Sequence, residues 1–142
     1  MKKLLFLVVF LIFNFSCFDE KNYIPIVSVN IDLDLNLPEY EQLNTIGSSL
    51  FITGGVKGII VYHFAINEYR AYDRNCSYEP SLQCARIDSI YSSIAFCGCC
   101  SSAFLLDQNG MAANSPAINP LREYSCVLNE NKNTLHIFNK YY

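Results

Sequence analysis

Cysteines are the residues of this sequence with the clearest capacity for chemistry. Cys76 lies in a turn-rich segment at 73–80, Cys84 follows eight residues later, and three more thiols lie at 97–100. Both segments follow stretches that are typical of strands, so short loops would carry the thiols. Two thiol-bearing loops about twenty residues apart can clamp a metal from two sides. Outside the cytosol, the same thiols would also suit disulfides.

The segments around these loops predict a sheet-rich domain. Apolar and polar residues alternate without a break from Val27 to Leu37, which is typical of a strand with one buried face. A helical turn is expected at 38–43, before Gly47. Further strands are expected at 50–53, 58–64, 69–72, 94–96, 104–106, 124–128 and 134–138, with turns at 54–55, 67–68, 109–110 and 129–133. Many short strands without a long amphipathic helix indicate an antiparallel sandwich or barrel.

The N-terminus resembles the signal peptide of a bacterial lipoprotein. Two lysines precede ten apolar residues (4–13), a stretch too short to span a bilayer as a helix. A small residue and Cys17 follow shortly after it. The resemblance implies that residues 1–16 are removed, that Cys17 is lipidated, that 17–25 form a tether and that 26–142 form one domain. We therefore expect a membrane-anchored protein of the bacterial cell envelope, in the periplasm or on the outer membrane.

Composition excludes several classes of protein. The 142 residues are 51% apolar and 16% charged, which argues against a disordered or coiled-coil chain. The net charge is −3 and the sequence contains no basic run, so nucleic acid is a poor candidate partner. The sequence contains no recognisable Ser/His/Asp set, phosphate loop or paired-carboxylate site. We expect at most an electron-transfer protein rather than an enzyme.

The second loop and the residues after it resemble the Rieske [2Fe-2S] family. That family has loops of the form Cys-x-His and Cys-x-Cys-His-Gly-Ser-x-Phe/Tyr, a Gly-rich turn and a proline segment. Here 97–104 read Cys-Gly-Cys-Cys-Ser-Ser-Ala-Phe, followed by Gly110 and by Ser-Pro-Ala-Ile-Asn-Pro-Leu at 115–121. The resemblance covers about residues 26–138. It implies an all-β, Rieske-like antiparallel sandwich or barrel with a small loop-built cluster subdomain.

Two ligand positions depart from the Rieske pattern. Cys76 and Cys97 stand at the family's cysteine positions, but Tyr78 and Cys100 stand at its histidine positions. In a Rieske cluster, one iron has two thiolates and the other has two imidazoles. A thiolate at Cys100 would keep a ligand and lower the reduction potential. A phenol with a pKa near ~10 is a poor ligand at neutral pH unless the metal displaces its proton.

The resemblance leaves the fourth ligand and the disulfides open. The metal ligands would be Cys76, Cys97 and Cys100, with Cys84, Tyr78 or Cys99 as the fourth. Alternatively, Cys99 matches a position that forms a loop-bracing disulfide in one branch of the family, and Cys84 lies close to where its partner would be. Ser102 matches a residue whose hydroxyl hydrogen-bonds the cluster, whereas Phe104 replaces a tyrosine donor found in some members. His63 and His136 lie in predicted strands outside both loops, so structural roles are expected for them.

Two functions from different classes follow. The first is a membrane-tethered, Rieske-like electron carrier that binds a [2Fe-2S] cluster and meets a redox partner protein. The second is a cluster-free binding or structural lipoprotein whose loops are braced by disulfides. The signal favours the second function, because its two lysines and lack of arginine suit export of an unfolded chain. Such a chain could hardly carry a preassembled cluster across the membrane.

Overall fold

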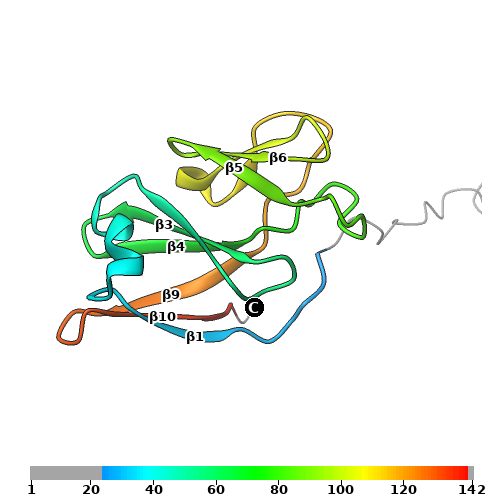
Figure 1. Cartoon of the computed structure of the whole chain (residues 1–142). Coiled ribbons are helices and arrows are strands. Elements are labelled where there is room, and N and C mark those ends of the chain that lie inside the picture. The colour runs from blue at the N-terminus through cyan, green and yellow to red at the C-terminus, as the bar shows by residue number, and fades with distance from the viewer. Residues whose placement is uncertain (1–23, 141–142) are drawn as a thin grey trace, which may run out of the picture.

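Two antiparallel sheets packed against each other form the domain, in a computed structural model that describes residues 24–140 (Figure 1). The six-stranded sheet has the order β1-β10-β9-β4-β3-β2 and the four-stranded sheet has the order β5-β6-β7-β8. The larger sheet comprises β1 (Asn30–Asp34), β2 (Ser49–Ile52), β3 (Ile59–Ala65), β4 (Glu68–Asp73), β9 (Glu123–Asn129) and β10 (Thr134–Asn139). The smaller sheet comprises β5 (Ile87–Tyr91), β6 (Ile94–Cys97), β7 (Ala103–Leu105) and β8 (Met111–Ala112), and two 3-10 helices are η2 (Pro38–Asn44) and η3 (Leu106–Gln108). The all-β class predicted from the sequence is confirmed.

The predicted signal peptide at 1–16, the lipidation site Cys17 and most of the tether lie outside the described residues. Within residues 24–140, no helix is both long enough and apolar enough to cross a membrane. The lipoprotein interpretation therefore stays a prediction.

Strand β1 is shorter than the alternation at 27–37 predicts. Val29, Leu33 and Leu35 are buried as expected, and β1 pairs with β10 so that Leu33 faces Leu135. The chain turns after β1, where the Leu37 N–H donates to the Asp34 carbonyl at 3.0 Å. Leu37 is therefore 45% exposed, which corrects the prediction for the end of this strand. The helical turn expected next is present as η2.

Strand β3 contributes to the hydrophobic clusters on both faces of the larger sheet. Its residues alternate between two hydrophobic clusters: Ile60 packs with the smaller sheet, whereas Ile59 and Val61 pack with β1 and β10. Because both faces are covered, β3 is a fully buried, β-branched strand, as its composition predicts. One face of β3 therefore packs against the smaller sheet.

The smaller sheet contains β5, a strand that the sequence did not predict. Ile87 is buried in β5, but the rest of the strand is largely exposed and carries polar residues, so it shows no clear period of two. Pairing with β6, from Ile87↔Cys97 to Tyr91↔Ile94, defines it as a strand. The hairpin closes at Ser92, which has a positive φ of 57°. Tertiary pairing rather than local preference therefore forms one side of the thiol-bearing subdomain.

Candidate metal centre

Two loops of the smaller subdomain carry five of the cysteines. The first loop connects β4 to β5 and contains Cys76 and Cys84. The second connects β6 to β7 and contains Cys99 and Cys100, directly after Cys97 at the end of β6. Each loop follows a paired strand, so the sheets determine where the thiols lie.

A buried carboxylate holds the start of the first loop. Asp73, at the end of β4, is fully buried and accepts hydrogen bonds from the Val56 N–H at 2.6 Å and the Asn75 N–H at 2.7 Å. The Tyr124 hydroxyl of β9 also donates to it, at 2.7 Å. These bonds join the turn before β3 and strand β9 to Asp73, three positions before Cys76. The backbone leading into Cys76 is thereby held in place.

A lysine holds the outer part of the same loop. Lys57 Nζ donates to the carbonyls of Pro80 and Ala85, each at 3.0 Å, and to that of Leu82. Burial lowers the pKa of Lys57, while the nearby thiols of Cys76 and Cys97 and the Asp73 carboxylate act in the opposite direction. Sequence reasoning missed both Lys57 and Asp73, because neither lies in a recognisable motif.

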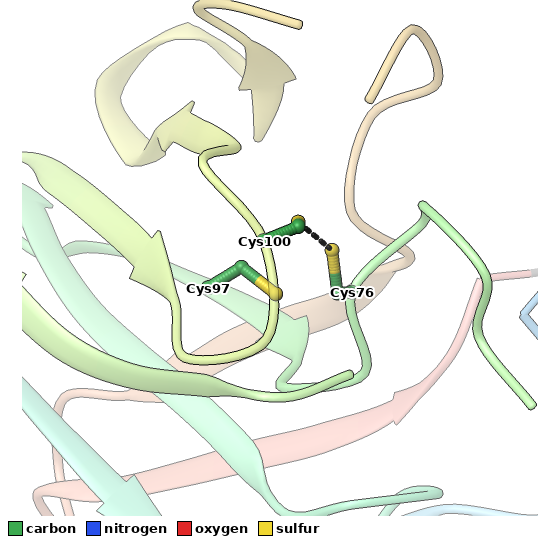
Figure 2. Close-up of side chains that lie close together, drawn as sticks. All are labelled: Cys76, Cys97 and Cys100. Atoms are coloured by element: carbon green, nitrogen blue, oxygen red, sulfur yellow. Dashed lines mark hydrogen bonds between the residues drawn. The ribbon is translucent and has the colours of Figure 1, made fainter. Parts of the chain in front are cut away.

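Three thiols converge between the loops. The Sγ atoms of Cys76, Cys97 and Cys100 all lie within 4.8 Å of one another. Figure 2 shows Cys76 reaching from the first loop toward Cys97 and Cys100 on the second, and the Cys76 and Cys100 sulfurs are 3.9 Å apart. Cys76 and Cys97 are buried, whereas Cys100 is half-buried. We refer to these three residues as the thiol triad.

Cys76 and Cys100 differ in how readily their thiols lose a proton. Burial raises the pKa of Cys76 well above its ordinary value, and the neighbouring thiols add to this, although a hydrogen bond from the Tyr78 backbone opposes it. Burial also tends to raise the pKa of Cys100, but hydrogen bonds from the side chain and backbone of Ser102 outweigh this and lower it. Cys100 therefore loses its proton more readily than Cys76. A bound cation would have to displace the proton of Cys76.

Cys84 does not join the triad, which corrects its predicted place among the metal ligands. Its sulfur forms a disulfide with Cys99, with the two Cα atoms 5.2 Å apart. A sulfur engaged in a disulfide is not a thiolate and so cannot act as a thiolate ligand. Because Cys99 is the other half of this disulfide, it is also excluded as the fourth metal ligand. This is the loop-bracing pair that the family resemblance implied.

Ser102 lies beside the thiol triad. It is 1% exposed, and its Oγ lies 3.2 Å from the Cys100 sulfur. The same oxygen accepts the Ala117 N–H at 2.9 Å, which connects the second loop to the proline segment. The hydroxyl proton remains available for an ionised Cys100. Phe104, whose ring cannot donate a hydrogen bond, is fully buried in the core beneath.

The remaining candidates lie apart from the triad. His63, in β3, stacks on Tyr69 with ring centroids 4.4 Å apart, and His136, in β10, has its Nδ1 2.6 Å from Asp32 Oδ1. Both histidines thus belong to the larger sheet, as expected. Cys126 lies in β9 of the same sheet, where burial raises the pKa of its thiol to about 12.

A Rieske cluster does not fit these donors. Such a cluster needs two imidazoles at its second iron, and the two positions concerned carry Tyr78 and Cys100. Tyr78 is partly buried and packs against the core beside the triad. Cys76 and Cys100, which the family pattern assigns to different irons, have sulfurs only 3.9 Å apart. The arrangement instead brings three thiol sulfurs within 4.8 Å of one another.

Comparison with known proteins identifies the fold. One similar solved structure is the ferredoxin of carbazole 1,9a-dioxygenase from Nocardioides aromaticivorans IC177, with a TM-score of 0.52 and 15% identity over 81% of this chain and 100% of that one. A chain in the complex of reduced oxygenase and oxidized ferredoxin in carbazole 1,9a-dioxygenase has the same TM-score and identity, over 82% and 97% of the two chains. No family model and no curated protein matches the sequence. The chain therefore has a Rieske-like fold.

Proposed function

We propose that this chain is a lipid-tethered electron-transfer protein of the bacterial envelope whose metal centre is held by Cys76, Cys97 and Cys100. The observation that carries the proposal is the convergence of three thiol sulfurs within 4.8 Å, at the loops of a fold shared with a ferredoxin. Thiolates are the ligands preferred by iron–sulfur centres, Cu(I) and Zn²⁺. A bound iron or copper would supply one-electron chemistry at this site.

The chain's own residues would prepare the site for such a metal. Ser102 stabilises the Cys100 thiolate, and Lys57 places a positive charge near the buried sulfurs. The Cys84–Cys99 bond joins the two loops. Burial of Cys76 and Cys97 excludes water from one side, while half-buried Cys100 marks the side where a partner could approach. One of the similar structures pairs a ferredoxin with an oxygenase, so we expect a redox enzyme as partner here too.

Metal analysis of the native protein tests this proposal. The full chain is expressed with its own signal, extracted from the envelope without added metal, and assayed for metals, acid-labile sulfide and free thiols. We expect bound iron or copper, reversible reduction, and three thiols that become reactive only after chelation in denaturant. A Cys17→Ser variant should lose its membrane association but keep its metal. Absence of metal, with the triad thiols freely reactive, would overturn the electron-transfer role.

A second function is favoured by the disulfide itself. Cys84–Cys99 braces the two loops without any metal, as a cluster-free binding or structural module would require. In that case, the native protein contains no stoichiometric metal and four free thiols, Cys76, Cys97, Cys100 and Cys126. The same extraction therefore separates the two functions.

A further inference from the structure

We propose that the thiol triad binds one thiophilic metal ion rather than a two-iron cluster, through Cys76, Cys97 and Cys100. This inference rests on the proposed function, in that it takes the triad to be a metal centre. It specifies the number of ions and the protein ligands of that centre. It also departs from what the Rieske-like fold would imply.

The spacing of the sulfurs is the first argument. Thiolates bind a metal such as zinc at about 2.3 Å, which separates two sulfurs by about 3.8 Å in a tetrahedral site and about 4.0 Å in a trigonal one. The Cys76 and Cys100 sulfurs are 3.9 Å apart, and all three sulfurs lie within 4.8 Å of one another. The 3.9 Å separation suits two ligands of one ion, whereas sulfurs at the 4.8 Å limit would have to approach each other by roughly 1 Å to share it. In a two-iron cluster, the residues at these two positions would bind different irons.

The number of donors is the second argument. Each iron of a two-iron cluster needs two protein ligands, four in total. Among residues 24–140, the cysteine, histidine and carboxylate side chains that converge here are the triad alone. The disulfide occupies Cys84 and Cys99, and both histidines lie in the larger sheet. Three thiolates complete a trigonal site, or a tetrahedral site whose fourth position takes water or the Tyr78 phenol.

Hydrogen bonds and charge around the sulfurs are the third argument. The Ser102 hydroxyl lies 3.2 Å from the Cys100 sulfur, where it can donate to the thiolate of a ligating Cys100. Such outer-shell donors orient and stabilise ligating thiolates. Three thiolates around a divalent ion leave a net charge of −1, and the Lys57 ammonium lies close enough to interact with Cys76 and Cys97. The surroundings thus suit a small anionic complex.

Cobalt titration tests the stoichiometry. Purified full-length protein with the Cys84–Cys99 bond intact is titrated anaerobically with Co²⁺ alone, followed by sulfur-to-cobalt charge-transfer absorption, and then with Zn²⁺ as competitor. We expect one ion per chain by native mass spectrometry. Serine at Cys76, Cys97 or Cys100 should weaken binding by more than the roughly 10–100-fold that loss of an outer-shell partner costs. Cys126→Ser, a free cysteine outside the triad, is the matched control and should bind normally.

The alternatives give distinct results. Reconstitution with iron and sulfide that yields two irons and two sulfides, protected by the same cysteines, would overturn the single-ion inference but keep the metal-centre proposal. Failure of cobalt, iron and Cu(I) alike to bind the triad would overturn both proposals. Circular dichroism verifies folding of each variant. If the buried Cys76→Ser variant does not fold, half-buried Cys100→Ser carries the test, and cobalt absorption unchanged in that variant would refute the inference.

Discussion

Replacing Ser102 by alanine is the sharpest test of how the protein surroundings support the triad. The change deletes an oxygen that accepts the Ala117 N–H at 2.9 Å and lies 3.2 Å from the Cys100 sulfur. Ala117 is 5% exposed, so its N–H would be left buried without this acceptor. An orphaned buried donor costs about 1–3 kcal/mol, which is the expected loss in the free energy of unfolding of the metal-free protein.

The same substitution should weaken metal binding separately. Loss of an outer-shell hydrogen bond to a ligand costs roughly 10–100-fold in metal affinity, and the Ser102 hydroxyl, 3.2 Å from the Cys100 sulfur, would donate that bond to a ligating thiolate. Urea unfolding of the metal-free protein measures the first effect, and cobalt titration of folded protein measures the second. Ser101→Ala is the matched control, because that neighbouring side chain is exposed. Reduced stability with unchanged cobalt affinity would refute a role for Ser102 at the metal.

Three further predictions follow from contacts around the site. Replacing Cys84 and Cys99 together by serine should lower the free energy of unfolding by about 3 kcal/mol, the loop-closure value for a 15-residue separation. The variant should still bind one cobalt per chain. Loss of cobalt binding would instead place Cys84 or Cys99 among the metal ligands. Lys57→Met keeps an apolar side chain but removes the hydrogen bonds to three carbonyls of the first loop. A reductant should therefore cleave the Cys84–Cys99 disulfide faster than in the wild type. Timed trapping of the released thiols measures the two rates. Burial raises the pKa of Tyr124 well above 10. The protonated phenol therefore contributes its full stability below pH 10. Above pH 10 the unfolded chain loses this proton first, so the free energy of unfolding falls by up to about 1.4 kcal/mol per pH unit. Alkaline urea unfolding should show a shallower decline for Tyr124→Phe, and identical slopes would contradict this reasoning.

Local sequence patterns predicted much of the fold. Alternation of apolar residues located β1, and β-branched composition identified β3 as buried on both faces. The Asn109-Gly110 turn follows from residues that accept positive φ, which the structure shows at 55° and 68°. Order and spacing in the second loop were enough to indicate the Rieske-like fold. These features depend on neighbouring residues, so one sequence suffices to predict them.

Contacts between residues distant in sequence determined the features of the fold and of the site that local patterns did not predict. Strand β5 exists because β6 lies beside it, and the end of β1 depends on a turn that competes with further pairing. The thiols could pair or bind metal in several ways until the loops brought Cys84 to Cys99 and left the triad together. Lys57 supports the first loop from the turn before β3, distant in sequence from the carbonyls to which it donates. Residue types and spacing thus identify the groups capable of chemistry, whereas the distances between their atoms depend on how the two sheets pack.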